Sequence, residues 1–199
     1  MNLVDKAIVF AVDKHEGQYR KSLGIPYVSH CFDVMKRLRL YDVEDPEILA
    51  AAILHDTIED THATREDLLA EFGERVTTIV MECTRPEVEG ETREQKFEYL
   101  FTFYQKSTAA LLLKVADRVC NVSDYRWVPD SRKYAAKYAL QAYPVYDALL
   151  QRIAFKELPY TVQDDLKEMQ SIIWEKAPDF SIFTPGQLTI VKAILFAKR

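Results

Sequence analysis

Glycine is scarce in this sequence, with only five among 199 residues, and alternating apolar runs are rare. Strands therefore have little support, and the pattern predicts an all-α protein. The glycine-rich motifs GxGxxG and GxxxxGK(S/T) do not occur, and neither does GxSxG. Their absence excludes a phosphate-cradling glycine loop and a serine nucleophile elbow.

Three cysteines are too few and too dispersed for a disulfide framework, and no CxxC pair is present. Charged residues interrupt the apolar N-terminal segment, which predicts neither a signal peptide nor a membrane span. A formal net charge of −5 argues against a general binder of nucleic acid or anionic membranes. We therefore expect a cytoplasmic protein with no nucleic-acid or membrane partner.

Apolar residues recur at helical spacing along most of the chain. They predict a helix that ends before Gly17, a second that begins at Val28, and a third that begins at Asp45-Pro46. Further helices are expected at about 74–84, 92–105, 107–126, 131–154 and 161–176. Residues 1–176 are expected to form the main domain.

A capping box is predicted at Thr64 and Asp67, opening a short helix that Gly73 ends. A second helix start is predicted at Thr184-Pro185, inside an appended segment of different composition, residues 177–199. We expect this tail to be a helix that docks its apolar stripe on the domain or on a second copy of the chain, giving a homo-oligomer. The alternative is a strand, because the tail contains several β-branched residues.

A helix of buried type is followed directly by a histidine and three carboxylates in AAILHDTIEDT, residues 51–61. An isolated ionised carboxylate in such a place costs on the order of several kcal/mol, so pairing or a metal is the usual remedy. Two imidazoles and two carboxylates are available on three predicted helices: His30, His55, Asp56 and Asp117. This set suits Mn²⁺, Fe²⁺ or Zn²⁺. Alternatively, His55 is a core histidine and Asp56 binds local backbone.

Glu59 and Asp60 follow His55 and Asp56 by one helical turn. If the helix continues, each lies four residues beyond a proposed ligand and near the same space. Acidic side chains are disfavoured at a helix C-terminus by the macrodipole, which makes a purely local role less attractive. A carboxylate pair beside a metal suits hydrolysis, because one group can deprotonate water and the other can protonate a leaving group. The alternative is a solvated acidic turn in which Asp60 or Thr61 caps the next helix.

Four motifs, in order, closely resemble the HD-type hydrolase domain of RelA/SpoT homologues, and the short length resembles the single-domain members, the small alarmone hydrolases. The motifs are HEGQYRKSLGIPYVSH (15–30), AAILHDTIEDT (51–61), EFGERVTTIVMECTR (71–85) and LLLKVADRVCN (111–121). The match covers roughly residues 3–155, and four ordered motifs are far more specific than an HD pair alone. The resemblance implies an all-α HD-domain helical bundle of about eight to ten helices.

The resemblance also implies roles for individual residues. One ion per chain, usually Mn²⁺ with Fe²⁺ or Zn²⁺ as alternatives, is held by His30, His55, Asp56 and Asp117. Glu59 and Asp60 form the catalytic pair. The substrate-binding residues are Arg20, Lys21, Asn121 and Tyr138, with Tyr143 competing for the role of Tyr138. A guanidinium can stack on a purine and an ammonium supplies a point charge, although a solvated loop is the alternative for Arg20 and Lys21.

The implied reaction is metal-dependent hydrolysis of the 3′-pyrophosphate of ppGpp or pppGpp, which releases pyrophosphate and GDP or GTP. This is the alarmone-degrading reaction of the stringent response. Removal of the 2′-phosphate of NADPH is an alternative of the same class. A non-catalytic nucleotide sensor would need neither the full ligand set nor the Glu59–Asp60 pair. The family's usual proline after the first ligand histidine is Cys31 here, and too few residues follow residue 155 for a synthetase domain.

Overall fold

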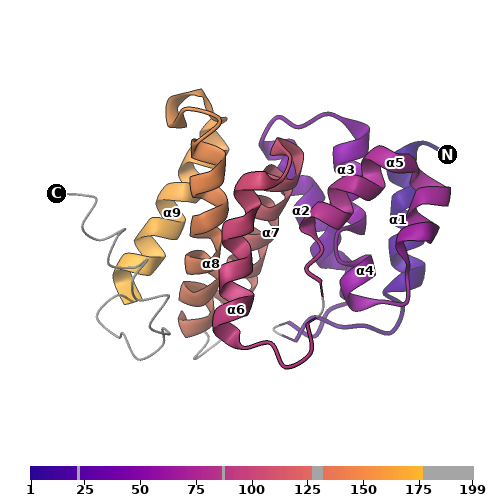
Figure 1. Ribbon diagram of the computed structural model, residues 1–199, viewed down its shortest axis with the longest axis horizontal. Helices are drawn as coiled ribbons and strands as arrows, with labels where there is room; N and C mark the ends of the chain where they lie inside the picture. The colour runs from indigo at the N-terminus through magenta and orange to yellow at the C-terminus, as the bar shows by residue number, and fades with distance from the viewer. Residues whose placement is uncertain (22, 87, 127–131, 177–199) are drawn as a thin grey trace.

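The all-α prediction is confirmed by the computed structural model, which describes residues 1–21, 23–86, 88–126 and 132–176 (Figure 1). Within those ranges the extended structure is limited to one bridge between Tyr19 and Pro26. The elements in chain order are α1 (Leu3–Lys14), α2 (Val28–Leu40), α3 (Pro46–Leu54), α4 (Thr57–Asp60), α5 (Arg65–Cys83), α6 (Arg93–Glu98), η1 (Tyr99–Gln105), α7 (Thr108–Arg126), α8 (Arg132–Leu150), η2 (Phe155–Glu157) and α9 (Tyr160–Lys176). The tail proposed at 177–199, with its terminal helix, lies outside the described residues.

Helix α3 lies among other helices because it is apolar on every side. Every residue from Leu49 to Leu54 is buried, and the helix contacts α1, α2, α5 and α7. A helix without a polar face is stable in water only when neighbours cover it all round. Its start matches the prediction: the Asp45 side chain accepts a 2.9 Å hydrogen bond from the backbone N–H of Glu47, and Pro46 occupies the first turn.

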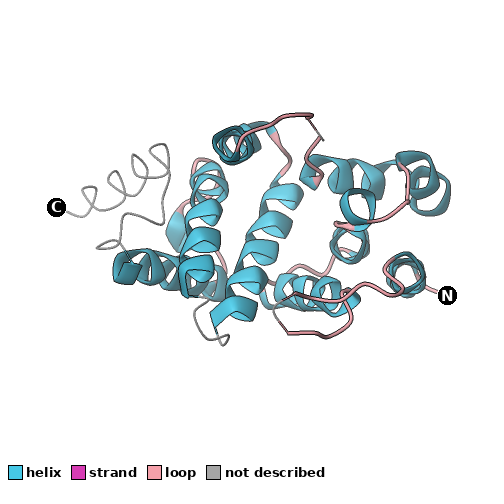
Figure 2. Cartoon of the chain, turned by 90° about the horizontal axis from the view of Figure 1, so that it is seen from below, coloured by secondary structure: helices cyan, strands magenta, loops and turns pink. Residues whose placement is uncertain are grey.

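Helices α7, α8 and α9 lie side by side and extend the bundle away from the N-terminus (Figures 1 and 2). Helix α7 also packs on α2, so it connects this layer to the α3 core. A buried polar contact joins α2 to α9, because Asp165 accepts a hydrogen bond from Tyr41 at 2.5 Å and an ion-pair contact from Arg37 at 3.3 Å. None of the helices in the described part of the chain has the length and apolarity needed to cross a bilayer.

The predicted capping box and glycine break are both confirmed. The Thr64 N–H donates to Asp67 at 2.9 Å, and the Asp67 N–H donates to the Thr64 hydroxyl at 3.1 Å. Gly73 has φ 80° and ψ 174°, which interrupts helical geometry within α5 before the helix resumes. A positive φ is readily adopted by glycine, since it has no Cβ.

Two predicted helices differ from the structure, one in its type and one in its C-terminal boundary. The single helix expected at 92–105 is instead α6 followed by the 3₁₀ helix η1, in which Leu100 and Phe103 are buried. Residues three apart eclipse in a 3₁₀ helix, so this geometry places both side chains on the core. The helix expected at 131–154 ends at Leu150. Two residues later, the Arg152 side chain donates a 2.8 Å hydrogen bond to the Tyr104 carbonyl.

Candidate metal centre and adjoining cleft

His55 and Asp56 form the short break between α3 and α4, so the continuous helix considered from the sequence is not formed. The Thr57 hydroxyl donates to the Leu54 carbonyl at 2.7 Å and thereby satisfies an acceptor at the end of α3. The Asp60 N–H donates to the Asp56 carbonyl at 2.9 Å, which starts the single turn of α4. The break places two consecutive polar side chains next to the buried face of the bundle.

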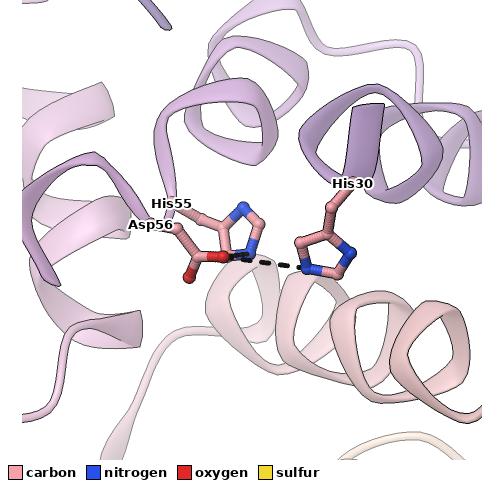
Figure 3. A group of neighbouring side chains, drawn as sticks. All are labelled: His30, His55 and Asp56. Carbon is pink, nitrogen blue, oxygen red and sulfur yellow. Dashed lines mark ion pairs between the residues drawn. The ribbon is translucent and has the colours of Figure 1, made fainter. Parts of the chain in front are cut away.

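Four side chains predicted as ligands converge at this break, and Figure 3 shows three of them, His30, His55 and Asp56. Figure 3 shows the Asp56 carboxylate facing both imidazoles, with its Oδ2 at 3.0 Å from His55 Nε2 and at 3.7 Å from His30 Nε2. Asp117, from α7, places its Oδ1 at 3.2 Å from His30 Nε2 and at 4.0 Å from His55 Nε2. All four residues are buried. The convergence joins α2, the α3–α4 break and α7.

The donor set fits a divalent ion. His55 Nδ1 donates to the Ala52 carbonyl at 2.8 Å, which leaves the Nε2 lone pair directed at the carboxylates. That Nε2 atom is buried and, among the described residues, makes no hydrogen bond. Donor atoms bound to one ion at about 2.0–2.2 Å lie about 3 Å from one another. The ligand atoms of His30, His55 and Asp56 lie within 4.8 Å of one another, close to that requirement.

Opposite charges keep both buried carboxylates ionised. Burial alone would raise the pKa of Asp56, but the imidazoles of His55 and His30 outweigh it and hold this pKa below its ordinary value. Burial of Asp117 is likewise outweighed, mainly by Lys114 and Arg118, and its pKa lies well below the ordinary value. Burial would lower the pKa of His55, but Asp56 and Asp117 raise it. The centre therefore favours positive charge at the position of the imidazole nitrogens.

Two residues that were not included in the predicted site support the predicted ligands. The Tyr27 hydroxyl donates to Asp56 Oδ2 at 2.7 Å, and Lys114 Nζ lies 3.0 Å from Asp117 Oδ2. Lys114 is only 6% exposed, so it is not part of the ordinary charged helix surface. Its i,i+3 spacing from Asp117 is a signal that could have identified it. Tyr27 offers no such signal, because it lies 29 residues from its partner.

A cleft of about 550 Å³ adjoins the centre and gathers the remaining predicted residues. Its lining includes Arg20, Lys21, Asp56, Glu59, Asp60, Asp117, Asn121 and Tyr138. Tyr143, the alternative to Tyr138, is not part of this lining, although both tyrosines pack against the hydrophobic core. The ligand histidines are more deeply buried than the cleft, at 3% and 1% exposure. The cleft thus brings a nucleotide-sized space next to the candidate metal centre.

The two acidic residues of α4 lie in this lining. Glu59 accepts a hydrogen bond from the backbone N–H of Arg85 at the end of α5. The residue is exposed overall, yet its carboxyl loses hydration next to the buried centre, which raises its pKa; nearby Lys114 opposes the shift. The Asp60 carbonyl accepts a 2.6 Å hydrogen bond from Gln18 Nε2. Both contacts connect α4 to loops at the edge of the cleft.

Arg20 is held by its neighbours, so the solvated-loop alternative is wrong for this residue. Its Nε donates to Asp124 at 2.8 Å, its Nη2 donates to Asn121 at 3.0 Å, and it is 8% exposed. The guanidinium carbon lies 5.5 Å from the centre of the Tyr27 ring. Lys21 is exposed at the cleft. Asp124 was not recognised from the sequence, because 104 residues separate it from Arg20.

A smaller space of about 220 Å³, here called the cationic annex, shares Glu59, Lys114, Arg118 and Tyr138 with the main cleft. Five basic residues contribute to its lining: Arg85, Lys96, Lys114, Arg118 and Lys137. Glu59 is the acidic residue in that lining. Two adjoining spaces therefore combine a carboxylate-rich end with a strongly positive end, an arrangement suited to a polyanion beside a metal ion.

Comparison with known proteins shows which family this chain resembles. Residues 7–153 match the family model described as HD domain. The chain is 36% identical over 144 residues to a guanosine-3′,5′-bis(diphosphate) 3′-pyrophosphohydrolase of Aquifex aeolicus, covering 70% of this chain and 20% of that protein. It is 31% identical over 171 residues to a probable GTP pyrophosphokinase of Mycobacterium leprae, covering 82% of this chain and 21% of the relative. The chain thus spans about a fifth of the length of these relatives.

A solved structure of a metazoan orthologue of SpoT superposes with a TM-score of 0.70 at 26% identity. The superposition covers 86% of this chain and 95% of that chain, so nearly all of the metazoan fold has a counterpart here. The matched model extends over most of the chain, including the His-Asp break between α3 and α4. The chain belongs to the HD-domain family.

Proposed function

We propose that this protein hydrolyses the 3′-pyrophosphate of ppGpp and pppGpp, releasing pyrophosphate and GDP or GTP. The observation that carries the proposal is that three features of the site lie next to one another. A divalent-metal centre, the Glu59–Asp60 pair and the cationic annex adjoin one another. Such a site offers activation of water, proton transfer and charge neutralisation for a polyphosphate.

The relatives support the same reaction. The Aquifex relative bears the name of the hydrolase, and the metazoan SpoT orthologue is described as hydrolysing ppGpp. The second comparison carries more weight, because 95% of that protein is covered by this chain. The Mycobacterium relative is named for the opposite reaction and, like the Aquifex relative, is matched over only about a fifth of its length. A pyrophosphokinase activity of so long a protein can reside outside the matched segment.

We further propose that His30, His55, Asp56 and Asp117 hold one ion, and that this ion is Mn²⁺. Two imidazoles and two carboxylates make a mixed donor set of the borderline-hard kind that suits Mn²⁺, with Fe²⁺ and Zn²⁺ as competitors. When bound, the ion supplies Lewis-acid polarisation of a phosphoryl oxygen and lowers the pKa of water. Tyr27 and Lys114 orient the two carboxylates from outside this set.

In the proposed reaction, a new bond forms between a water oxygen and the phosphorus next to the 3′-oxygen, and the bond from that phosphorus to the 3′-oxygen breaks. Asp60 accepts the water proton, and protonated Glu59 gives its proton to the departing 3′-oxygen. The raised pKa of Glu59 suits the acid role, because the carboxyl keeps its proton to higher pH than an ordinary glutamate. The Arg85 N–H holds the Glu59 carboxyl in place.

Substrate binding is proposed to use the basic residues of both spaces. Arg20 offers a held guanidinium for a purine face or a phosphate, and Lys21 adds a point charge at the cleft. Asn121 lies between Arg20 and Asp117, and Tyr138 borders both spaces, so each can contact the nucleotide. The annex would take one of the two polyphosphate groups, whose charge matches its lysines and arginines.

The test is to incubate Mn²⁺-loaded protein with ppGpp, pppGpp, ppApp, NADPH and a simple phosphomonoester, and to separate the products. We expect pyrophosphate and GDP from ppGpp, with little release from the phosphomonoester. The matched control is the Asp60→Asn variant, which should bind the metal but not turn over. Release of phosphate from NADPH alone would replace the proposal with a 2′-phosphatase. Nucleotide binding without any product would indicate a sensor.

A further inference from the structure

We propose that Asp124 is a positioning residue that sets substrate affinity by holding Arg20, an inference that rests on the proposed function. Arg20 Nε donates to Asp124 Oδ2 at 2.8 Å, and Nη2 contacts the same oxygen. The two side chains are 8% and 16% exposed, so water screens this ion pair weakly. It connects the loop after α1 to the far end of α7, across 104 residues of sequence.

Asp124 acts on the cleft through Arg20. The main cleft is lined by Arg20 and Asn121, whereas Asp124 lines a separate space of about 290 Å³ between α2 and α7. Arg20 therefore separates Asp124 from the nucleotide space. A residue in this place changes substrate binding by changing the orientation of the arginine, without touching the reacting atoms.

Three neighbours immobilise the guanidinium. Asp124 and Asn121 take hydrogen bonds along one edge, and the Tyr27 ring lies 5.5 Å from the guanidinium carbon. Arginine has many rotamers, and ordering it during binding would cost conformational entropy. Because Asp124 orders the side chain beforehand, the substrate meets a group already in position.

A double-mutant cycle tests the proposal on the full chain with Mn²⁺ bound. Asp124→Asn keeps the size of the side chain and removes its charge, and we expect KM for ppGpp to rise roughly five- to twentyfold while kcat changes less than about twofold. In an Arg20→Ala background, the same Asp124→Asn change should leave KM unchanged. A merely structural role for Asp124 would give additive effects instead.

Asp33→Asn is the matched control, because Asp33 is an exposed acidic residue that lines the same separate space as Asp124. We expect its KM to equal that of the parent protein. An unchanged or lowered KM in Asp124→Asn would overturn the proposal, and so would additive effects in the cycle. Equal melting temperatures would show that the substitutions leave the fold intact.

A second measurement does not depend on turnover. Phenylglyoxal modifies accessible arginines, and peptide mass spectrometry reports the rate at Arg20. We expect Asp124→Asn to increase this rate roughly fivefold or more, because the side chain loses its main partner. An unchanged rate would overturn the positioning role. If the parent protein failed to hydrolyse ppGpp while Asp124→Asn still increased the modification rate at Arg20, the proposed function would be refuted. The Arg20–Asp124 relationship would be retained.

Discussion

His30 Nε2 lies 3.2 Å from Asp117 Oδ1, although 87 residues separate the two in the sequence. The contact brings α2 against α7, and the break that carries His55 and Asp56 completes the group. An ion bound here would join three separate parts of the chain. Its binding should therefore be measurable both as stoichiometry and as stability.

We predict one divalent ion per chain in protein purified with Mn²⁺. An ion present at about 100 times its Kd should stabilise the fold by about 2.7 kcal/mol relative to chelator-treated protein. His55→Ala should lose both the ion and the stabilisation, whereas His62→Ala, at an exposed histidine, should keep both. Elemental analysis and thermal melts with and without chelator measure the two effects. An active protein free of metal would refute the prediction.

Glu59→Gln and Asp60→Asn should retain the ion and the nucleotide, yet lose turnover. General acid and base groups typically contribute ~10²–10⁴-fold, so kcat should fall by that order. Glu89→Gln, at an exposed loop position, is the control and should keep the parent kcat. A melting temperature lowered in Asp60→Asn together with normal kcat would mean that the acidic turn is a structural cap.

Lys114→Met should destabilise the metal-free protein more than the metal-loaded protein. Lys114 lies 3.0 Å from Asp117, and both side chains are buried. Removing one partner of a buried ion pair costs about 3–5 kcal/mol, since the remaining charge is uncompensated. A bound ion would supply that compensation to Asp117. Urea unfolding with and without chelator measures the difference, with Lys156→Met at an exposed lysine as the control. Equal losses in both states would contradict an ion at Asp117.

Stability should depend on pH through Asp165. Burial raises the pKa of this carboxyl above its ordinary value of 3.8, despite hydrogen bonding from Tyr41 and the charge of Arg37. The folded state therefore binds the proton more tightly than the unfolded state, and stability is lost as pH rises from 3.8 through the raised pKa. Asp165→Asn should remove this loss, so its stability relative to the parent should rise across that interval.

Denaturant unfolding at several pH values between acid and neutral checks this expectation. Asp164→Asn is the control, because it removes a carboxyl of about half exposure at the neighbouring position. The change in unfolding free energy of Asp165→Asn at each pH is compared with that of this control. If Asp165→Asn shifted uniformly with pH, the raised pKa would have no measurable consequence for folding.

Most of the helical bundle could be predicted, because the signals are local. Apolar spacing and the Thr64–Asp67 capping box depend on residues a few positions apart. The 3₁₀ geometry of η1 was not predictable in this way, since it depends on which side chains the core accepts. The sequence left the break at His55-Asp56 open, because helical spacing through Asp60 is compatible with a continuous helix as well as with a break.

The candidate site was likewise predictable only where the sequence signal is local. Residues of unusual type beside apolar helices, such as His30 and Asp117, are recognisable because their burial requires a partner. Their supporting contacts are not recognisable, because Tyr27, Asp124 and the Arg85 N–H meet their partners only after the chain has folded. Lys114 is the exception, since it lies one helical turn from Asp117.

The hydrogen bond from the Arg85 N–H to Glu59 has a consequence for how this site tolerates variation. The donor belongs to the main chain, so any residue except proline at position 85 can supply it. Substitution scanning would therefore find position 85 permissive with respect to Glu59. A one-residue deletion in the last turn of α5 would displace the donor from the carboxylate without changing any proposed catalytic side chain. For the contact with Glu59, the register of the main chain at the end of α5 matters more than the side chain at position 85.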